Sequence, residues 1–139
     1  MSLIGQKEKT WETKVANIVI IDDSNFQRKI ITKFVKAEGH ETFEGANGKI
    51  GLELIATHKP DTILCDLVMP EVDGFEVLRT LQEQGSKIPV IILTADIQAP
   101  VREQCMQLGA RKFLNKPFNQ SQMREALDEI LGVGGEDSQ

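Results

Sequence analysis

Val19-Ile20-Ile21-Asp22-Asp23 is a short apolar run that ends in two acids, and three more short apolar runs along the chain also end in a polar residue. The polar residues that end the four runs are Asp22-Asp23, Asp66, Thr94 and Lys116. Each run has the length and the continuous apolar character of a buried parallel strand. Helical periodicity fills the intervals between the runs. The carboxyl ends of parallel strands line one crevice in an open sheet, so we expect these side chains to meet there.

The whole pattern predicts five strands that alternate with five helices. We expect the strands at 16–21, 41–44, 61–65, 88–93 and 111–114. We expect the helices between Ser24 and Gly39 and at 47–57, 74–83, 99–108 and 119–131. Ser24 and Asn119 are the expected N-caps of the first and last helices, with Gln27 and Gln122 as their capping-box partners. Right-handed crossovers put helices on both faces of the sheet, which predicts one doubly wound α/β domain.

The chain has 139 residues, which is about the length of one domain. We expect that domain at 15–131, after a polar N-terminal extension at 1–14 and before a tail at 132–139. The tail has the composition of a mobile segment. Trp11 is the residue of the extension that we expect to pack on something.

Charge and composition argue against several classes of protein. The net charge is −5 and the sequence shows no basic stripe, so nucleic acid is not an expected partner. The apolar runs are too short to span a membrane, and no secretory signal opens the chain. Cys65 and Cys105 lack a paired metal-ligand spacing and are expected to be buried thiols. These features predict a cytoplasmic protein.

Asp22, Asp23 and Asp66 would bring three carboxylates into one crevice, where they repel each other unless a cation joins them. Mg²⁺ prefers oxygen ligands, and beside it a carboxylate can act as a nucleophile toward phosphorus. The Lys116 ammonium and the Thr94 hydroxyl would suit the other phosphoryl oxygens. Helix capping is an equally good explanation of Asp23 taken alone. It is a weaker explanation of Asp66, because no helix is expected to begin there.

On these residues the chain resembles the receiver domain of bacterial two-component response regulators, and most closely the chemotaxis-type single-domain receivers. The resemblance covers roughly 15–131. The motifs that carry it are Ile21-Asp22-Asp23-Ser24, Asp66-Leu67-Val68-Met69-Pro70 with Asp73-Gly74, Thr94-Ala95-Asp96, and Lys116-Pro117-Phe118. It implies a flavodoxin-like sheet with the strand order 2-1-3-4-5. It also implies a phosphoacceptor that assists its own phosphorylation and dephosphorylation, and not an enzyme in the ordinary sense.

The resemblance implies a role for each residue at the expected crevice. Asp66 would be the phosphoacceptor. Asp66 and Asp23 would bind Mg²⁺ directly, Asp22 mainly through water, and the Val68 backbone carbonyl would be a further ligand. Val68 and Asp96 would also tune how water reaches the aspartyl phosphate.

Two further roles concern the phosphoryl group and the switch. Thr94 and Lys116 would bind the phosphoryl group, and the bond between Lys116 and Pro117 would be cis. On phosphorylation Thr94 would move toward the phosphoryl group, and Phe113 would rotate into the space that it leaves. The chain contains no Tyr, so Phe113 would switch by packing alone.

The implied partners are a sensor histidine kinase or phosphotransfer protein as donor and a separate protein as output target. The output target would bind the face formed by the fourth helix, the fifth strand and the fifth helix. The last helix is expected to end near residue 131, so no attached output domain is expected. Chemotaxis is one pathway that the resemblance suggests.

Two other kinds of protein share parts of this pattern. One is a receiver-fold module that binds its partner without phosphorylation, although such modules usually lose an acid or the lysine. The other is an enzyme, either a Mg²⁺-dependent phosphatase or a flavin or nucleotide binder. The phosphatase would need Asp-x-Asp after the first strand. The flavin or nucleotide binder would need a Gly/Ser/Thr-rich loop there. This chain has Asp22-Asp23-Ser24 at that point.

Overall fold

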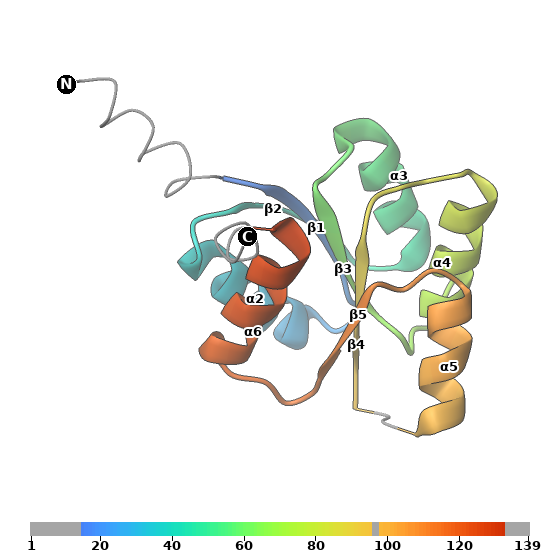
Figure 1. The fold of residues 1–139 in the computed structure, drawn as a ribbon. Helices are drawn as coiled ribbons and strands as arrows, with labels where there is room; N and C mark the ends of the chain where they lie inside the picture. Colours follow the sequence, from blue (N-terminus) through green and yellow to red (C-terminus); the bar gives the residue numbers. More distant parts are fainter. Residues whose placement is uncertain (1–14, 96–97, 133–139) are drawn as a thin grey trace.

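A parallel five-stranded sheet forms the centre of the protein in a computed structural model that describes residues 15–95 and 98–132 (Figure 1). The strands are β1 (Asn17–Ile21), β2 (Glu41–Gly45), β3 (Thr62–Asp66), β4 (Val90–Thr94) and β5 (Lys112–Asn115). Their spatial order is β2-β1-β3-β4-β5, and every neighbouring pair is parallel. The sheet order and the five alternating helices confirm the expected flavodoxin-like architecture. Trp11, most of the expected tail and Asp96 lie outside the described residues.

Helices cover both faces of the sheet. They are α2 (Asn25–Ala37), α3 (Gly48–His58), α4 (Gly74–Glu83), α5 (Ala99–Gln107) and α6 (Gln120–Leu131). Helices α2 and α6 lie on one face, and α3, α4 and α5 lie on the other (Figure 1). Successive side chains of a strand point to opposite faces, so each strand supplies both layers of the core. In β1, Ile18 and Ile20 pack under α2 and α6, while Val19 and Ile21 pack on the opposite side.

The fourth strand begins at Val90, two residues later than the sequence pattern predicts. Pro89 precedes it and has no N–H to donate to a ladder. The Pro89 carbonyl still accepts hydrogen bonds from the Ile63 amide and the Thr62 hydroxyl. The residues before β4 therefore contact β3 without extending the strand.

Two glycines let α3 approach the sheet closely. A Cβ atom at Gly51 would lie 2.3 Å from Cδ1 of Ile21, the last residue of β1. A Cβ atom at Gly48 would lie 2.4 Å from the carbonyl oxygen of Val72, in the loop between β3 and α4. Helix α3 thus packs against both the end of β1 and the segment that follows β3.

The helix ends follow the signals in the sequence at most positions. Asn119 and Gln122 form the reciprocal capping box that the sequence predicts for α6. The Asp73 side chain caps α4 by accepting a hydrogen bond from the Glu76 amide at 3.0 Å. None of the helices in the described part of the chain has the length and apolar character needed to cross a bilayer.

Candidate functional site

The carboxyl ends of the central strands surround a hollow of about 370 Å³. The residues that line it are Asp22, Asp23, Ser24, Gln27, Asp66, Val68, Thr94, Ala95 and Lys116. Every residue that we expected to bind a metal ion or a phosphoryl group is among them. The parallel arrangement of the strands brings these residues together, although they are far apart in the sequence.

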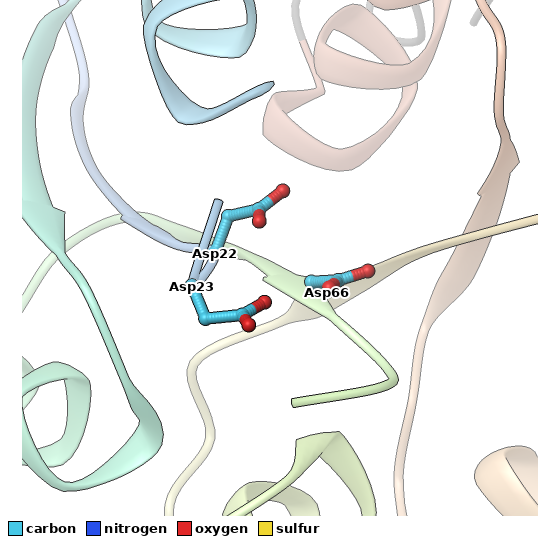
Figure 2. A group of neighbouring side chains, drawn as sticks. All are labelled: Asp22, Asp23 and Asp66. Carbon is cyan, nitrogen blue, oxygen red and sulfur yellow. The ribbon is translucent and has the colours of Figure 1, made fainter. Parts of the chain in front are cut away.

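Three carboxylates lie side by side in this hollow. Asp22 and Asp23 follow β1, and Asp66 ends β3 (Figure 2). One carboxylate oxygen from each residue lies within 4.8 Å of the other two. Asp22 is fully buried, Asp66 is 8% exposed, and Asp23 is exposed to solvent. Hard oxygen donors with this spacing and this charge are the ligand set that suits a divalent cation such as Mg²⁺.

Lys116 contacts the carboxylates of both buried acids. Its ammonium donates hydrogen bonds to Asp66 Oδ1 at 3.0 Å, to Gln27 Oε1 at 2.7 Å and to Asp22 Oδ2 at 3.4 Å. A lysine ammonium has three N–H donors, so these contacts use its whole capacity. Lys116 therefore connects the acids at the ends of two strands with the first turn of α2.

Opposing effects act on the phosphoacceptor candidate. Burial raises the pKa of Asp66 above its ordinary value, and the charges of Asp22 and Asp23 act in the same direction. The hydrogen bond and the positive charge of Lys116 lower this pKa. A nucleophilic carboxylate must be ionised. The positive charge of Lys116 therefore favours the ionised, reactive form of Asp66.

Gln27 is a residue of the site that the sequence interpretation missed. The predicted capping box assigned its side chain to the backbone N–H of Ser24. That N–H donates to Asp22 Oδ1 at 2.9 Å instead, while Gln27 Oε1 accepts from Lys116. Only the other half of the predicted cap forms, with the Gln27 amide donating to Ser24 Oγ at 3.2 Å. The position of Gln27 in the sequence could have identified it as a site residue. It lies in the first turn of the helix that directly follows β1, and this turn lies at the carboxyl end of the sheet.

Arg28 holds the turn that carries the two acids. Its guanidinium donates to the Asp22 carbonyl oxygen at 2.7 Å and forms an ion pair with Glu44 of β2 at 3.1 Å. The Arg28 side chain is only 12% exposed. It therefore joins the end of β1 to β2 and limits the movement of the Asp22 backbone.

The remaining site residues lie on β4, on β5 and after β5. Thr94 is buried at the end of β4, and its carbonyl oxygen accepts from the Lys116 amide at 2.9 Å. The Lys116–Pro117 bond is cis, as the resemblance implied. Phe113 lies on β5 beside Ile92, is partly buried, and carries the Arg102 guanidinium over its ring.

The chain matches the family model of the response regulator receiver domain over residues 18–128, so it belongs to this family. Members of the family are phosphoacceptors in two-component signal transduction, and this confirms the function class that the motifs predicted.

Similar proteins come from three bacteria. Sporulation initiation phosphotransferase F of Bacillus subtilis is 32% identical over 114 residues, which cover 82% of this chain and 92% of the relative. Protein PilH of Pseudomonas aeruginosa is 34% identical over 119 residues, which cover 84% and 98% of the two chains. The solved structure of chemotaxis protein CheY4 of Vibrio cholerae superimposes with a TM-score of 0.80 at 26% identity. That superposition covers 85% of this chain and all of the other. Each of the three comparisons covers more than four fifths of this chain.

Proposed function

We propose that Asp66 accepts a phosphoryl group from a phosphohistidine of a separate donor protein. In this proposal Asp22, Asp23, Asp66 and the Val68 backbone carbonyl hold Mg²⁺. The observation that carries the proposal is the single hollow that contains three adjacent carboxylates and the Lys116 ammonium. Val68 lines the same hollow, and the residue as a whole is 73% exposed.

The proposed transfer is a displacement at phosphorus. A carboxylate oxygen of Asp66 attacks the phosphorus, the bond from phosphorus to the donor nitrogen breaks, and its electron pair stays on the imidazole. Lys116 is already within hydrogen-bond distance of Asp66 and is positioned to neutralise one phosphoryl oxygen. The Thr94 hydroxyl donates to another. Bound Mg²⁺ would supply further neutralisation of the charge that is spread over the phosphoryl oxygens.

The signal leaves the site through Thr94 and Phe113. In the proposed active state Thr94 moves toward the phosphoryl group, and the Phe113 ring moves inward by packing alone. Phosphorylation would thus shift the balance between two arrangements of one fold. Val68 and Asp96 would tune the access of water to the aspartyl phosphate.

The proposed donor is a sensor histidine kinase or a phosphotransfer protein, and the proposed output target is a separate protein, with chemotaxis as one candidate pathway. The target binds the surface formed by α5, β5 and α6. We infer that the receiver domain extends over 15–131 and is a regulatory phosphoacceptor. We also infer a cytoplasmic location, which is supported by the two buried free thiols, Cys65 and Cys105.

Intact mass spectrometry tests the proposal. The whole chain is incubated with acetyl phosphate, with and without Mg²⁺, beside the variant Asp66→Asn. We expect one phosphoryl adduct on the unchanged chain with Mg²⁺ and no adduct in the other samples. A phosphoryl adduct of equal yield on Asp66→Asn would reject Asp66 as the acceptor. No adduct on either chain would favour a phosphorylation-independent binding module.

A further inference from the structure

A second hollow, of about 240 Å³, lies between α5, β5 and α6. The residues that define its character are Arg102, Met106, Arg111, Lys112, Phe113 and Glu129. Three of these side chains are cationic, and one, Glu129, is acidic. Such a local excess of positive charge contrasts with the net charge of −5 on the whole chain.

The cations of this hollow differ in how far they are already neutralised. Lys112 Nζ lies 2.8 Å from Glu129 Oε1. Among residues 15–95 and 98–132, neither Arg102 nor Arg111 forms an ion pair. The described part of the chain therefore supplies no carboxylate partner for these two guanidinium groups. Arginine binds carboxylates through two parallel hydrogen bonds, which adds geometric selectivity to the charge.

Apolar groups lie beside these cations. Met106 is 50% exposed and lies one helical turn after Arg102 on α5. The Arg102 guanidinium carbon lies 5.2 Å from the centroid of the Phe113 ring. This separation is within the range of a cation–π contact. The Arg102 side chain therefore covers part of the ring, and the ring holds the guanidinium in place.

We propose that this hollow binds an acidic segment of the output target, with carboxylates on Arg102 and Arg111 and an apolar side chain on Met106. This inference rests on the proposed function, because it names the chemistry of the partner for the proposed output surface. A nucleic acid is a poorer match, since its phosphates need a longer cationic surface than one hollow that also contains Glu129.

The contact between Arg102 and Phe113 couples this hollow to the phosphorylation site. If Phe113 moves inward, Arg102 loses the ring beneath it and its guanidinium becomes free to pair with a carboxylate. The acidic segment therefore binds more tightly to the phosphorylated protein. The chain has no Tyr, so the ring at position 113 carries no hydroxyl that could report its position. The Arg102 guanidinium is a polar group that can do so instead, because its freedom to bind a carboxylate changes when the ring moves.

Fluorescence anisotropy with two labelled peptides tests the inference on the full chain. One peptide contains Asp, Glu and Leu, and the matched peptide has Asn and Gln in place of the acids. We expect the acidic peptide to bind about tenfold more tightly than the amide peptide, and the difference to shrink at high salt.

Three charge variants separate this hollow from general surface charge. We expect Arg102→Gln to weaken binding of the acidic peptide by about fivefold and Glu129→Gln to strengthen it by about threefold. Glu129 has a side chain that is 64% exposed, so its replacement is not expected to disturb folding. Arg79→Gln is the matched control, because Arg79 is a partly exposed arginine of α4 that pairs with Glu76, and we expect no change.

Several results would overturn the inference. Equal binding of the two peptides would do so, as would a Glu129→Gln variant that binds the acidic peptide no better. Tighter binding of a DNA oligonucleotide of equal charge would identify the hollow as a nucleic-acid site instead. The peptide measurements use the unphosphorylated chain, so their results can be interpreted even if no phosphoryl adduct forms. If the adduct forms but peptide binding does not depend on charge, this inference is rejected and the proposed function is retained. Repeating the titration with beryllofluoride and Mg²⁺ tests the coupling, for which we expect tighter binding.

Discussion

Lys116 and Asp66 are 50 positions apart in the sequence, yet the lysine ammonium lies 3.0 Å from the aspartate carboxylate. The strands that deliver them are not neighbours, because β4 lies between β3 and β5. The contact forms because each residue lies at the carboxyl end of its strand, and both side chains line the same hollow. The ammonium thus acts as the counter-ion of two acids that are mostly withdrawn from water.

Replacing this lysine tests the strength of that arrangement. We expect Lys116→Met to lower the free energy of unfolding by about 2 kcal/mol at neutral pH in EDTA. This is less than for a fully buried pair, because the Lys116 side chain is 19% exposed. Urea denaturation measures the change. Lys112→Met is the matched control, since it removes a surface ion pair with Glu129 and should cost less than about 1 kcal/mol. Equal losses in the two variants would refute a special role for Lys116.

Magnesium should stabilise the folded chain. A cation that binds the three clustered carboxylates in the folded state alone raises the unfolding free energy as its concentration rises. We expect the melting temperature to increase with Mg²⁺, and Asp23→Asn to abolish most of that increase. Glu83→Gln, an exposed acid on α4, serves as the control that keeps the full response. A response to Mg²⁺ that survives in Asp23→Asn would argue against these ligands.

The close contact between α3 and β1 can be tested with one added methyl group. A Cβ atom at Gly51 would collide with Ile21 Cδ1, and overpacking of this kind costs about 1–3 kcal/mol. We therefore expect Gly51→Ala to lower the unfolding free energy by that amount. Ile21→Val removes the colliding Cδ1 atom, so the double variant should recover part of the loss in a double-mutant cycle. If the losses in unfolding free energy of the two single variants simply add in the double variant, the added methyl group does not collide with Ile21 Cδ1.

His40 should make stability depend on pH. Its Nδ1 atom accepts a hydrogen bond from the Ala16 amide at 3.1 Å, which requires an unprotonated nitrogen. Burial lowers the pKa of His40 below its ordinary value of 6.5, although the carboxylates of Glu38, Asp128 and Asp61 oppose this change. Because the folded-state pKa lies below the unfolded one, the contribution is present above pH 6.5 and is lost as the pH falls through and below that value.

The measurement for His40 compares the unfolding free energies of the unchanged chain and of His40→Gln between pH 5 and pH 8. Gln retains a hydrogen-bond acceptor but does not titrate in this range. We expect the stability of the unchanged chain to fall relative to the variant as the pH drops. A constant difference across the whole range would show that His40 does not titrate during unfolding in this window.

Much of the fold and site followed from patterns that the sequence states directly. Apolar runs such as Val90 to Leu93 identify buried parallel strands, and the rule about their carboxyl ends predicts that Asp22, Asp66 and Thr94 meet. The direction of single side chains was beyond such rules. Gln27 fits a capping box by spacing, but its side chain binds Lys116, because Asp22 Oδ1 already accepts the Ser24 amide.

The cationic hollow beside β5, an edge strand of the sheet, shows the same limit. Arg102 and Arg111 belong to none of the motifs identified in the sequence. Their common location with Glu129 depends on how α5 and α6 flank β5, and this packing has no local signature in the chain. The cation–π contact between Arg102 and Phe113 likewise depends on tertiary packing and not on spacing along one helix.

The most direct test of the central claim is to identify the residue that carries the phosphoryl group. The chain is treated with acetyl phosphate and Mg²⁺ and then with borohydride, which reduces an aspartyl phosphate to homoserine and leaves free aspartate unchanged. Peptide mass spectrometry then locates the homoserine. Our account predicts homoserine at position 66 and at no other position, with none formed when Mg²⁺ is omitted. Homoserine at position 22 or 23, or at no position despite a phosphoryl adduct, would contradict it.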